Sequence, residues 1–204
     1  MLTALQAIEW AQSKCRADII SMSFGYIHDQ QSISKAIRSA INDRNESILF
    51  FAAAANFGAN EREMFPARHE CVISIRGTNS NGVFQDFNPP RNSREKTVLG
   101  TLGLEVPSAS LSHETGEVHR TGTSTATAVA AGMAGMLLGY VSSKSSKPMY
   151  HNVRDKLRTR EGMLAIFEYI ASDSLNNGYL YVAPWRLQDI SDEIRWTMFQ
   201  AAVS

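Results

Sequence analysis

The chain has 204 residues, of which 44% are hydrophobic and 20% are charged, so it is long and apolar enough for one substantial core. Twenty basic residues balance twenty acidic ones, which excludes the basic surface typical of proteins that bind nucleic acid or anionic membranes. No apolar run predicts a span of a bilayer, and the first residues lack the pattern of a signal peptide. We therefore expect neither nucleic acid nor membrane as a partner.

The first half of the chain alternates between helical and strand-like patterns. Apolar residues recur at helical spacing over residues 4–15, and this helix is expected to begin with no capping segment before it. A short apolar run at residues 18–25, "DIISMSFG", predicts a buried strand, and residues 33–41 follow the spacing of an amphipathic helix. The run "SILFFAAAAN", residues 47–56, is apolar on successive positions, which is typical of a parallel strand covered on both faces.

The later elements continue the alternation and define the fold class. Further strands are expected at residues 71–77 and 98–103, and a helix runs from Ser124 to about Val141, with Met133, Met136 and Leu138 as its core stripe. A polar hinge at residues 142–148 precedes a helix capped by Thr159 that buries Met163, Phe167 and Ile170, then aromatic residues 179–185 and a last helix with Ile194, Trp196 and Phe199. The sequence predicts an α/β fold of three layers with a mostly parallel sheet. Cys15 and Cys71 are interpreted as buried free thiols.

Two residues have the chemistry of an acyl-transfer site. Ser124 lies at a predicted helix start, where backbone amides and the helix dipole favour a developing negative charge. Asn56 directly follows a buried strand and is therefore expected at the carboxyl edge of the sheet. A serine at a helix start is also a common cap, and an asparagine after a strand is a common turn residue. Both interpretations remain open on these residues alone.

The segment around Ser124, "GTSTATAVAAG", resembles the sequence around the catalytic serine of the subtilisin family. Four further segments resemble that family in the same order: residues 18–25, "FFAAAANFGAN" at 50–60, "FPARHECVISIRGTNSNGVFQDF" at 65–87 and "VLGTLGLEVPSAS" at 98–110. Five ordered segments are more specific than any single motif. The resemblance covers about residues 1–142, the carboxyl-terminal half of a peptidase domain, and implies a subtilisin-like fold that lacks the amino-terminal strands. Residues 143–204 are then an extension that packs on this domain or links it to another.

The resemblance also implies roles for particular residues. Ser124 is implied as the nucleophile and Asn56 as the oxyanion donor. The remaining residues are implied to bind substrate: Ser23, Phe24 and Gly25 as an edge that pairs with the peptide backbone, and Ala53, Ala54 and Ala55 as a pocket wall. No cofactor is expected; calcium is common in the family, but no acidic loop of the sequence resembles a calcium site. The expected partner is a peptide or protein substrate.

The sequence departs from the family pattern in ways that bear on activity. Ala55 stands where the family has a glycine, and neither the aspartate nor the histidine of the family's catalytic triad is found. His113 and His119 precede Ser124 in an implied surface hairpin, and we do not expect either histidine to replace the missing catalytic base. We therefore expect an upstream segment that carries the aspartate and histidine.

The leading hypothesis is a serine endopeptidase domain that is inactive as this chain alone. The alternative is a subtilase-like module that binds peptides or another domain without catalysis. The segment from Thr159 to Trp185 is similar to the tail of intracellular subtilase-like domains of filamentous fungi, which implies an intracellular protein.

Overall fold

A computed structural model describes residues 3–92, 97–110, 118–144, 151–173 and 178–204 of the chain. Its main sheet has six strands, in the spatial order β1 (Ile19–Met22), β2 (Leu49–Ala53), β3 (Ile73–Thr78), β4 (Val98–Leu102), β8 (Tyr179–Val182) and β7 (Ala171–Asp173). Neighbouring strands pair in parallel except β7 and β8. The strands β5 (Val106–Ser108) and β6 (Val118–Arg120) form a separate antiparallel pair.

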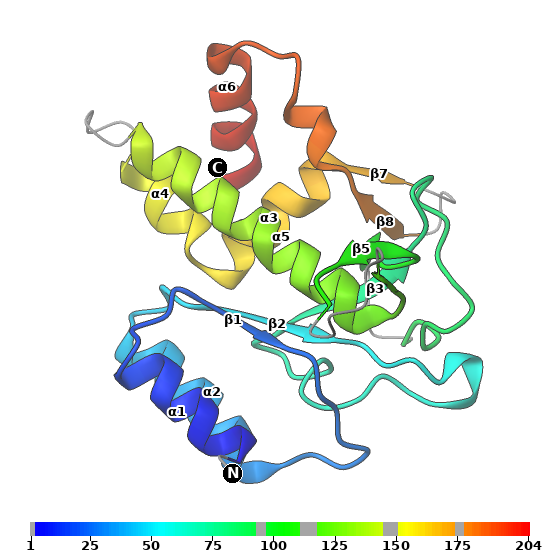
Figure 1. The fold of residues 1–204 in the computed structure, drawn as a ribbon. Helices are drawn as coiled ribbons and strands as arrows, with labels where there is room; N and C mark the ends of the chain where they lie inside the picture. The colour runs from blue at the N-terminus through cyan, green and yellow to red at the C-terminus, as the bar shows by residue number, and fades with distance from the viewer. Residues whose placement is uncertain (1–2, 93–96, 111–117, 145–150, 174–177) are drawn as a thin grey trace.

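Helices cover both faces of this sheet and make the three layers (Figure 1). On one face lie α1 (Ala4–Ser13) and α2 (Gln31–Asp43); on the other lie α3 (Thr123–Ser143), α4 (His151–Leu157), α5 (Arg160–Ile170) and α6 (Asp192–Val203). Short 3-10 turns occur at η1 (Gly58–Asn60) and η3 (Pro184–Leu187). The predicted three-layer α/β fold with a mostly parallel sheet is confirmed.

Strand β2 shows why its sequence is apolar on successive residues. Leu49 and Phe51 belong to the hydrophobic cluster beneath α3 and α5, whereas Phe50 and Ala52 belong to the cluster beneath α1 and α2. Because side chains alternate between the two faces of a strand, a sheet with helices on both sides needs apolar residues at every position.

The N-terminal helix differs from the expectation in how it begins. The prediction that α1 has no capping segment is wrong, because the Thr3 side chain accepts a hydrogen bond from the Gln6 amide at 3.3 Å. The Gln6 side chain in turn accepts from the Thr3 amide at 2.9 Å, which completes a capping box. Glutamine in the third helical position was the signal that the sequence carried.

The C-terminal extension shares the sheet and core of the preceding residues. Strand β8 pairs with β4, and Phe167 of α5 packs against Phe51 with ring centroids 5.9 Å apart. Helix α5 begins where predicted, since the Thr159 side chain accepts from the Gly162 amide at 3.2 Å. Asp18, before β1, forms ion pairs with Arg44 and with Arg158 of the extension. The aromatic segment 179–185 therefore contributes a strand that the sequence did not predict.

A buried ion pair lies under the loop that follows β2. Arg76 of β3 is 1% exposed and Glu63 is 8% exposed, with Nη1 and Oε1 3.5 Å apart. The Ser74 hydroxyl also donates to the Glu63 carboxylate. Arg76 donates to the carbonyls of Pro89 at 3.3 Å and Pro90 at 3.4 Å. The guanidinium thus joins the loop before β3 to the loop after it.

Three expectations about individual side chains are corrected. Met136, expected in the core stripe of α3, is 65% exposed, whereas Met133 and Leu138 are buried as predicted. Met136 is exposed because it lies on the side of α3 away from the sheet. Cys15 and Cys71 are free, but Cys15 is exposed and Cys71 is only half-buried. Burial raises the pKa of the Cys71 thiol.

Helix α3 also corrects the expectation that no apolar run has the length of a membrane span. Its 21 residues are long and apolar enough by length and composition. In this structure the helix packs across strands β1 to β4 (Figure 1). A core helix of this kind passes the same test of length and composition.

Candidate active site

Ser124 is the second residue of α3, as the sequence predicts. The residue that precedes the helix is Gly122, and its position makes no side-chain capping bond. Among the residues that the structure describes, the Ser124 hydroxyl has no hydrogen-bond partner. Ser124 is half-buried and does not cap the helix, so its oxygen is left available for chemistry.

Asn56 takes the capping role at this helix instead. Its Oδ1 accepts a hydrogen bond from the Thr123 backbone amide at 2.8 Å. Because a backbone amide can only donate, this bond fixes the orientation of the carboxamide and leaves Nδ2 as a free-standing donor. Within the described part of the chain, Nδ2 has no protein partner. An amide donor and a serine hydroxyl thus lie at the same helix start.

Two glycines permit this close approach of α3 to the sheet. A Cβ on Gly122 would lie 3.0 Å from Asn56 Nδ2, and its φ of +140° disfavours any other residue. A Cβ on Gly103, after β4, would lie 2.9 Å from the Gly122 carbonyl oxygen and 3.0 Å from Ala126 Cβ. The Gly122 amide donates to the Gly103 carbonyl at 2.8 Å. Glycine at both positions therefore sets where the serine and the carboxamide meet.

The segment after β1 lies at the same carboxyl edge of the sheet. The Ser23 hydroxyl donates to the Ser124 carbonyl at 3.5 Å, which brings these two predicted site residues together. Phe24 is half-buried, and Gly25 is exposed. A Cβ on Gly25 would lie 2.7 Å from the Met64 sulfur, so Met64 packs directly on the glycine. Met64 was missed by the sequence analysis, because no local pattern links it to Gly25.

Ala53, Ala54 and Ala55 are all buried, and their backbone is partly committed to the protein. The Ala54 carbonyl accepts from the Met64 amide at 3.0 Å, and the Ala54 amide donates to the Ile75 carbonyl at 3.2 Å. Ala55 adopts a φ of +149°, a backbone conformation that residues other than glycine rarely adopt. The family glycine that the sequence lacks at this position therefore corresponds to a backbone conformation that glycine would adopt without strain.

None of the histidines with described side chains is placed as a base for Ser124. His119 lies in β6 and is exposed, and His28 is exposed in the loop after β1. His69 is hydrogen bonded to the Ser34 hydroxyl at 2.8 Å. The predicted alternative base His113 lies outside the described residues.

The pair of Ser34 and His69 resembles a catalytic dyad but has the wrong proton arrangement. The Cys71 amide donates to His69 Nδ1 at 3.2 Å, so Nδ1 carries no proton and Nε2 carries it. Nε2 then donates to Ser34 and does not accept its proton. The pair holds the fold together and does not activate a nucleophile.

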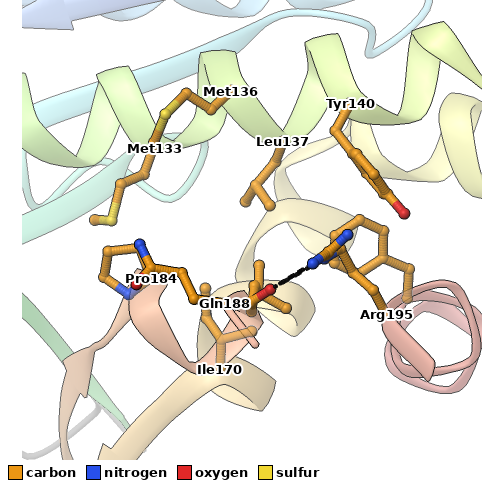
Figure 2. A pocket seen from close by; sticks show the side chains of 10 residues that line it. Met133, Met136, Leu137, Tyr140, Ile170, Pro184, Gln188 and Arg195 are labelled. Carbon is orange, nitrogen blue, oxygen red and sulfur yellow. Dashed lines mark hydrogen bonds between the residues drawn. The ribbon is translucent and has the colours of Figure 1, made fainter. Parts of the chain in front are cut away.

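Ser124 lines neither of two cavities in the described part of the chain. Across the described ranges, no group of three or more His, Cys, Asp or Glu side chains is arranged to hold a metal ion. A polar cavity of about 930 Å³ opens beside Met64 and is also lined by Arg62, Glu63 and Arg68. A smaller apolar pocket of about 200 Å³ lies between α3, η3 and α6 (Figure 2).

Figure 2 shows Met133, Met136 and Leu137 of α3 facing Pro184 and Ile170 across this apolar pocket. Arg195 closes one end, where its guanidinium donates to the Leu187 carbonyl at 2.8 Å. The pocket adjoins the C-terminal half of α3, whereas Ser124 lies at its N-terminus. It therefore belongs to the packing of the extension and not to the site of Ser124.

Ser124 at a helix start and the oriented carboxamide of Asn56 thus lie together at the carboxyl edge of a parallel sheet. Residues 1–161 match the family model described as the subtilase family, and the chain belongs to that family of serine peptidases. It is 29% identical over 182 residues to a thermostable alkaline protease of Halalkalibacterium halodurans. That match covers 89% of this chain but 45% of the relative, so the chain spans less than half of the relative's length.

Solved structures show the same fold. The protease domain of PatA, in a mutant form, has 21% sequence identity and a TM-score of 0.69, with 98% of this chain and 66% of that chain covered. The prenylagaramide maturation protease PagA has 21% identity and a TM-score of 0.67 with the same coverage. The PatG macrocyclase in complex with peptide has 21% identity and a TM-score of 0.63, covering 83% and 47% of the two chains. These likenesses confirm the subtilisin-like fold.

Proposed function

We propose that this chain forms part of a serine endopeptidase in which Ser124 attacks the peptide carbonyl. One observation carries the proposal: Asn56 Oδ1 is held by the Thr123 amide, so Nδ2 is fixed as a donor beside the Ser124 helix start. A donor of fixed direction stabilises negative charge on a tetrahedral intermediate, and the Ser124 amide supplies a second donor. The exposed edge at Ser23 and Gly25 is proposed to pair with the substrate backbone.

In this mechanism a histidine takes the Ser124 proton while the hydroxyl oxygen forms a bond to the carbonyl carbon. The same histidine then protonates the leaving amine, and the acyl-enzyme forms as the peptide bond breaks. Water attacks the acyl-enzyme and releases the acid, which restores the serine.

The histidine and its aspartate are proposed to come from a segment outside these 204 residues. Two features support this proposal. Among the strands that the structure describes, β1 has a sheet neighbour on one side only, and an open strand edge favours pairing with a further strand. On α3, Ala128, Gly132 and Gly139 are exposed, and a Cβ on Gly132 or Gly139 would meet nothing within 4 Å. Small residues on an open helix face allow another helix to pack closely.

The first measurement is the intact mass and N-terminal sequence of the natural polypeptide. A polypeptide longer than this chain that carries an aspartate and a histidine upstream supports the peptidase proposal. A natural product of 22.5 kDa would leave Ser124 without a base among the histidines whose side chains the structure describes, and would favour the binding module described below.

The second measurement is hydrolysis of fluorogenic peptides by the natural full-length protein and its variants. Ser124→Ala is expected to abolish turnover. Asn56→Ala is expected to lower kcat by about 10²–10³, the loss known for the oxyanion asparagine of subtilisin itself. The matched controls are Thr125→Ala in the same helical turn and Asn60→Ala in the exposed η1 turn, which should retain activity. Unchanged turnover in Ser124→Ala would refute the proposal.

The second candidate is a non-catalytic module that binds peptides or another domain through the Ser23–Gly25 edge. The placement of His69 and His119 away from a base role favours it. Peptide binding that survives Ser124→Ala, with no turnover in the full-length protein, would select this candidate over the peptidase.

We also propose an intracellular location, supported by the exposed free thiol of Cys15, which a reducing compartment would preserve. Cell fractionation tests this location.

A further inference from the structure

His69 is held through both ring nitrogens, and one of these bonds requires a neutral ring. The Cys71 amide donates to Nδ1 at 3.2 Å, and Nε2 lies 2.8 Å from the Ser34 hydroxyl oxygen. A protonated imidazole has hydrogens on both nitrogens, so Nδ1 would no longer accept from the amide. Protonation of His69 therefore breaks the bond that closes the turn before β3.

The turn that His69 closes directly follows Met64 and Phe65, which pack beside the candidate site. His69 and Val72 close successive backbone bonds within this turn, where the His69 amide donates to the Pro66 carbonyl and the His69 carbonyl accepts from Val72, both at 2.9 Å. Phe65, directly before Pro66, packs its ring against the imidazole with centroids 6.0 Å apart.

Phe65 and Met64 contact both the segment after β1, which is the proposed substrate edge, and the segment before Asn56. Phe65 exchanges two backbone hydrogen bonds with Tyr26, at 2.7 and 3.0 Å, directly after Gly25. Met64 packs on Gly25 and donates its amide to the Ala54 carbonyl at 3.0 Å. The pair Met64 and Phe65 thus supports the segment after β1 and the segment before Asn56 together.

The charges that face His69 come from four elements. Arg38 lies on α2 and pairs with Glu70 of the same turn at 3.0 Å, Asp29 lies in the loop after β1, and Arg160 begins α5. Burial lowers the pKa of His69, and Arg38 and Arg160 lower it further, while Glu70 and Asp29 raise it. The net direction is downward, so the ring is neutral above its ordinary titration range.

We propose that His69 is a positioning residue, whose neutral ring holds Met64 and Phe65 against the substrate edge and whose protonation in acid loosens that edge and weakens peptide binding. This inference rests on the proposed function, because it takes the segment around Gly25 as the site of the substrate backbone. It assigns a pH response to the binding of substrate that is separate from the titration of the catalytic base.

The first test is amide hydrogen exchange of Tyr26 and Phe65 in the full-length protein, corrected for intrinsic rates, from pH 7.5 to pH 5.0. Protection is expected to fall about three- to tenfold in the wild type, because opening becomes coupled to proton uptake. His69→Asn offers an oxygen that accepts from the Cys71 amide and does not titrate, so its protection should be flat over this range. His28→Asn is the matched control, an exposed histidine in the loop after β1, and should behave as the wild type. An equal fall in His69→Asn, or no fall in the wild type, would overturn the proposal.

The second test is the pH dependence of KM and kcat for a fluorogenic peptide in the full-length protein. The titration of the base is common to wild type and His69→Asn, so the ratio of their KM values isolates His69. We expect this ratio to rise about three- to tenfold in acid while the kcat profiles coincide. A constant ratio would refute the link to substrate. Absence of turnover at every pH would refute the peptidase proposal, and the exchange measurement distinguishes this failure from a failure of His69.

Discussion

The buried pair of Arg76 and Glu63 allows a prediction with a large expected magnitude. In the Arg76→Met variant the side-chain volume is largely kept, but the Glu63 carboxylate, which is 8% exposed, loses the Arg76 cation beside it. The carbonyls of Pro89 and Pro90 also lose a donor. Breaking a buried ion pair by removing one partner costs about 3–5 kcal/mol, because the remaining charge loses part of its compensation in a medium of low polarity.

The assay is urea unfolding of the 204-residue chain at pH 7, together with thermal unfolding. A cost of about 3–5 kcal/mol corresponds to a fall in Tm of about 6–20 °C for a chain of this size. Adding Glu63→Gln to Arg76→Met removes the buried negative charge and should restore at least about 1 kcal/mol.

Arg38→Met is the matched control, because Arg38 pairs with Glu70 at the surface, where both side chains are more than half exposed. Exposed pairs contribute about 0–1 kcal/mol. If Arg76→Met costs no more than Arg38→Met, then burial does not govern the energetics of the pair and the reasoning is wrong.

Three further predictions concern the site and its surroundings. Gly122→Ala should destabilise the chain by about 2–4 kcal/mol in urea unfolding, since it places a methyl at a φ of +140° and against Asn56; a change below about 1 kcal/mol would contradict the geometry. Asp18→Asn, which weakens two partly exposed ion pairs, should cost less than about 1 kcal/mol, and the cost should fall further in 1 M salt. The lowered pKa of His69 means that the unfolded chain takes up the proton first, so stability should be full above about pH 6.5 and decline below it; urea midpoints of wild type and His69→Asn, compared from pH 7.5 to 5.0, check this sign.

Local patterns were enough to predict the strands and helices that carry the candidate site. The successive apolar residues of β2 require a sheet covered on both faces, and Gly122 followed by small residues predicts a helix that starts at Ser124. The meeting of Asn56 with the helix start followed from the rule that parallel strands end at a common edge.

Features that depend on contacts distant in sequence were not predictable in the same way. Met64 packs on Gly25 only because the loop after β2 folds back against the segment after β1. The hydrogen bond from the Cys71 amide to the His69 ring follows no repeating sequence pattern that could predict it. Strand β8 has a short apolar and aromatic run, and its place beside β4 depends on a partner far back in the chain. Met136 was misplaced because the apolar stripe of α3 extends beyond the face that packs on the sheet.

The position of β8 also bears on how the protein is made in the cell. Strands β1 to β4 leave the ribosome in the order in which they pair, so this part of the sheet can assemble during synthesis. The outer edge of β4 then stays unpaired until β8, which begins at Tyr179, has been synthesised. At about 5–20 residues per second, translation from Leu102 to Tyr179 takes roughly 4–15 s. During that interval the nascent chain presents an unpaired apolar strand edge, which favours aggregation until β8 is inserted.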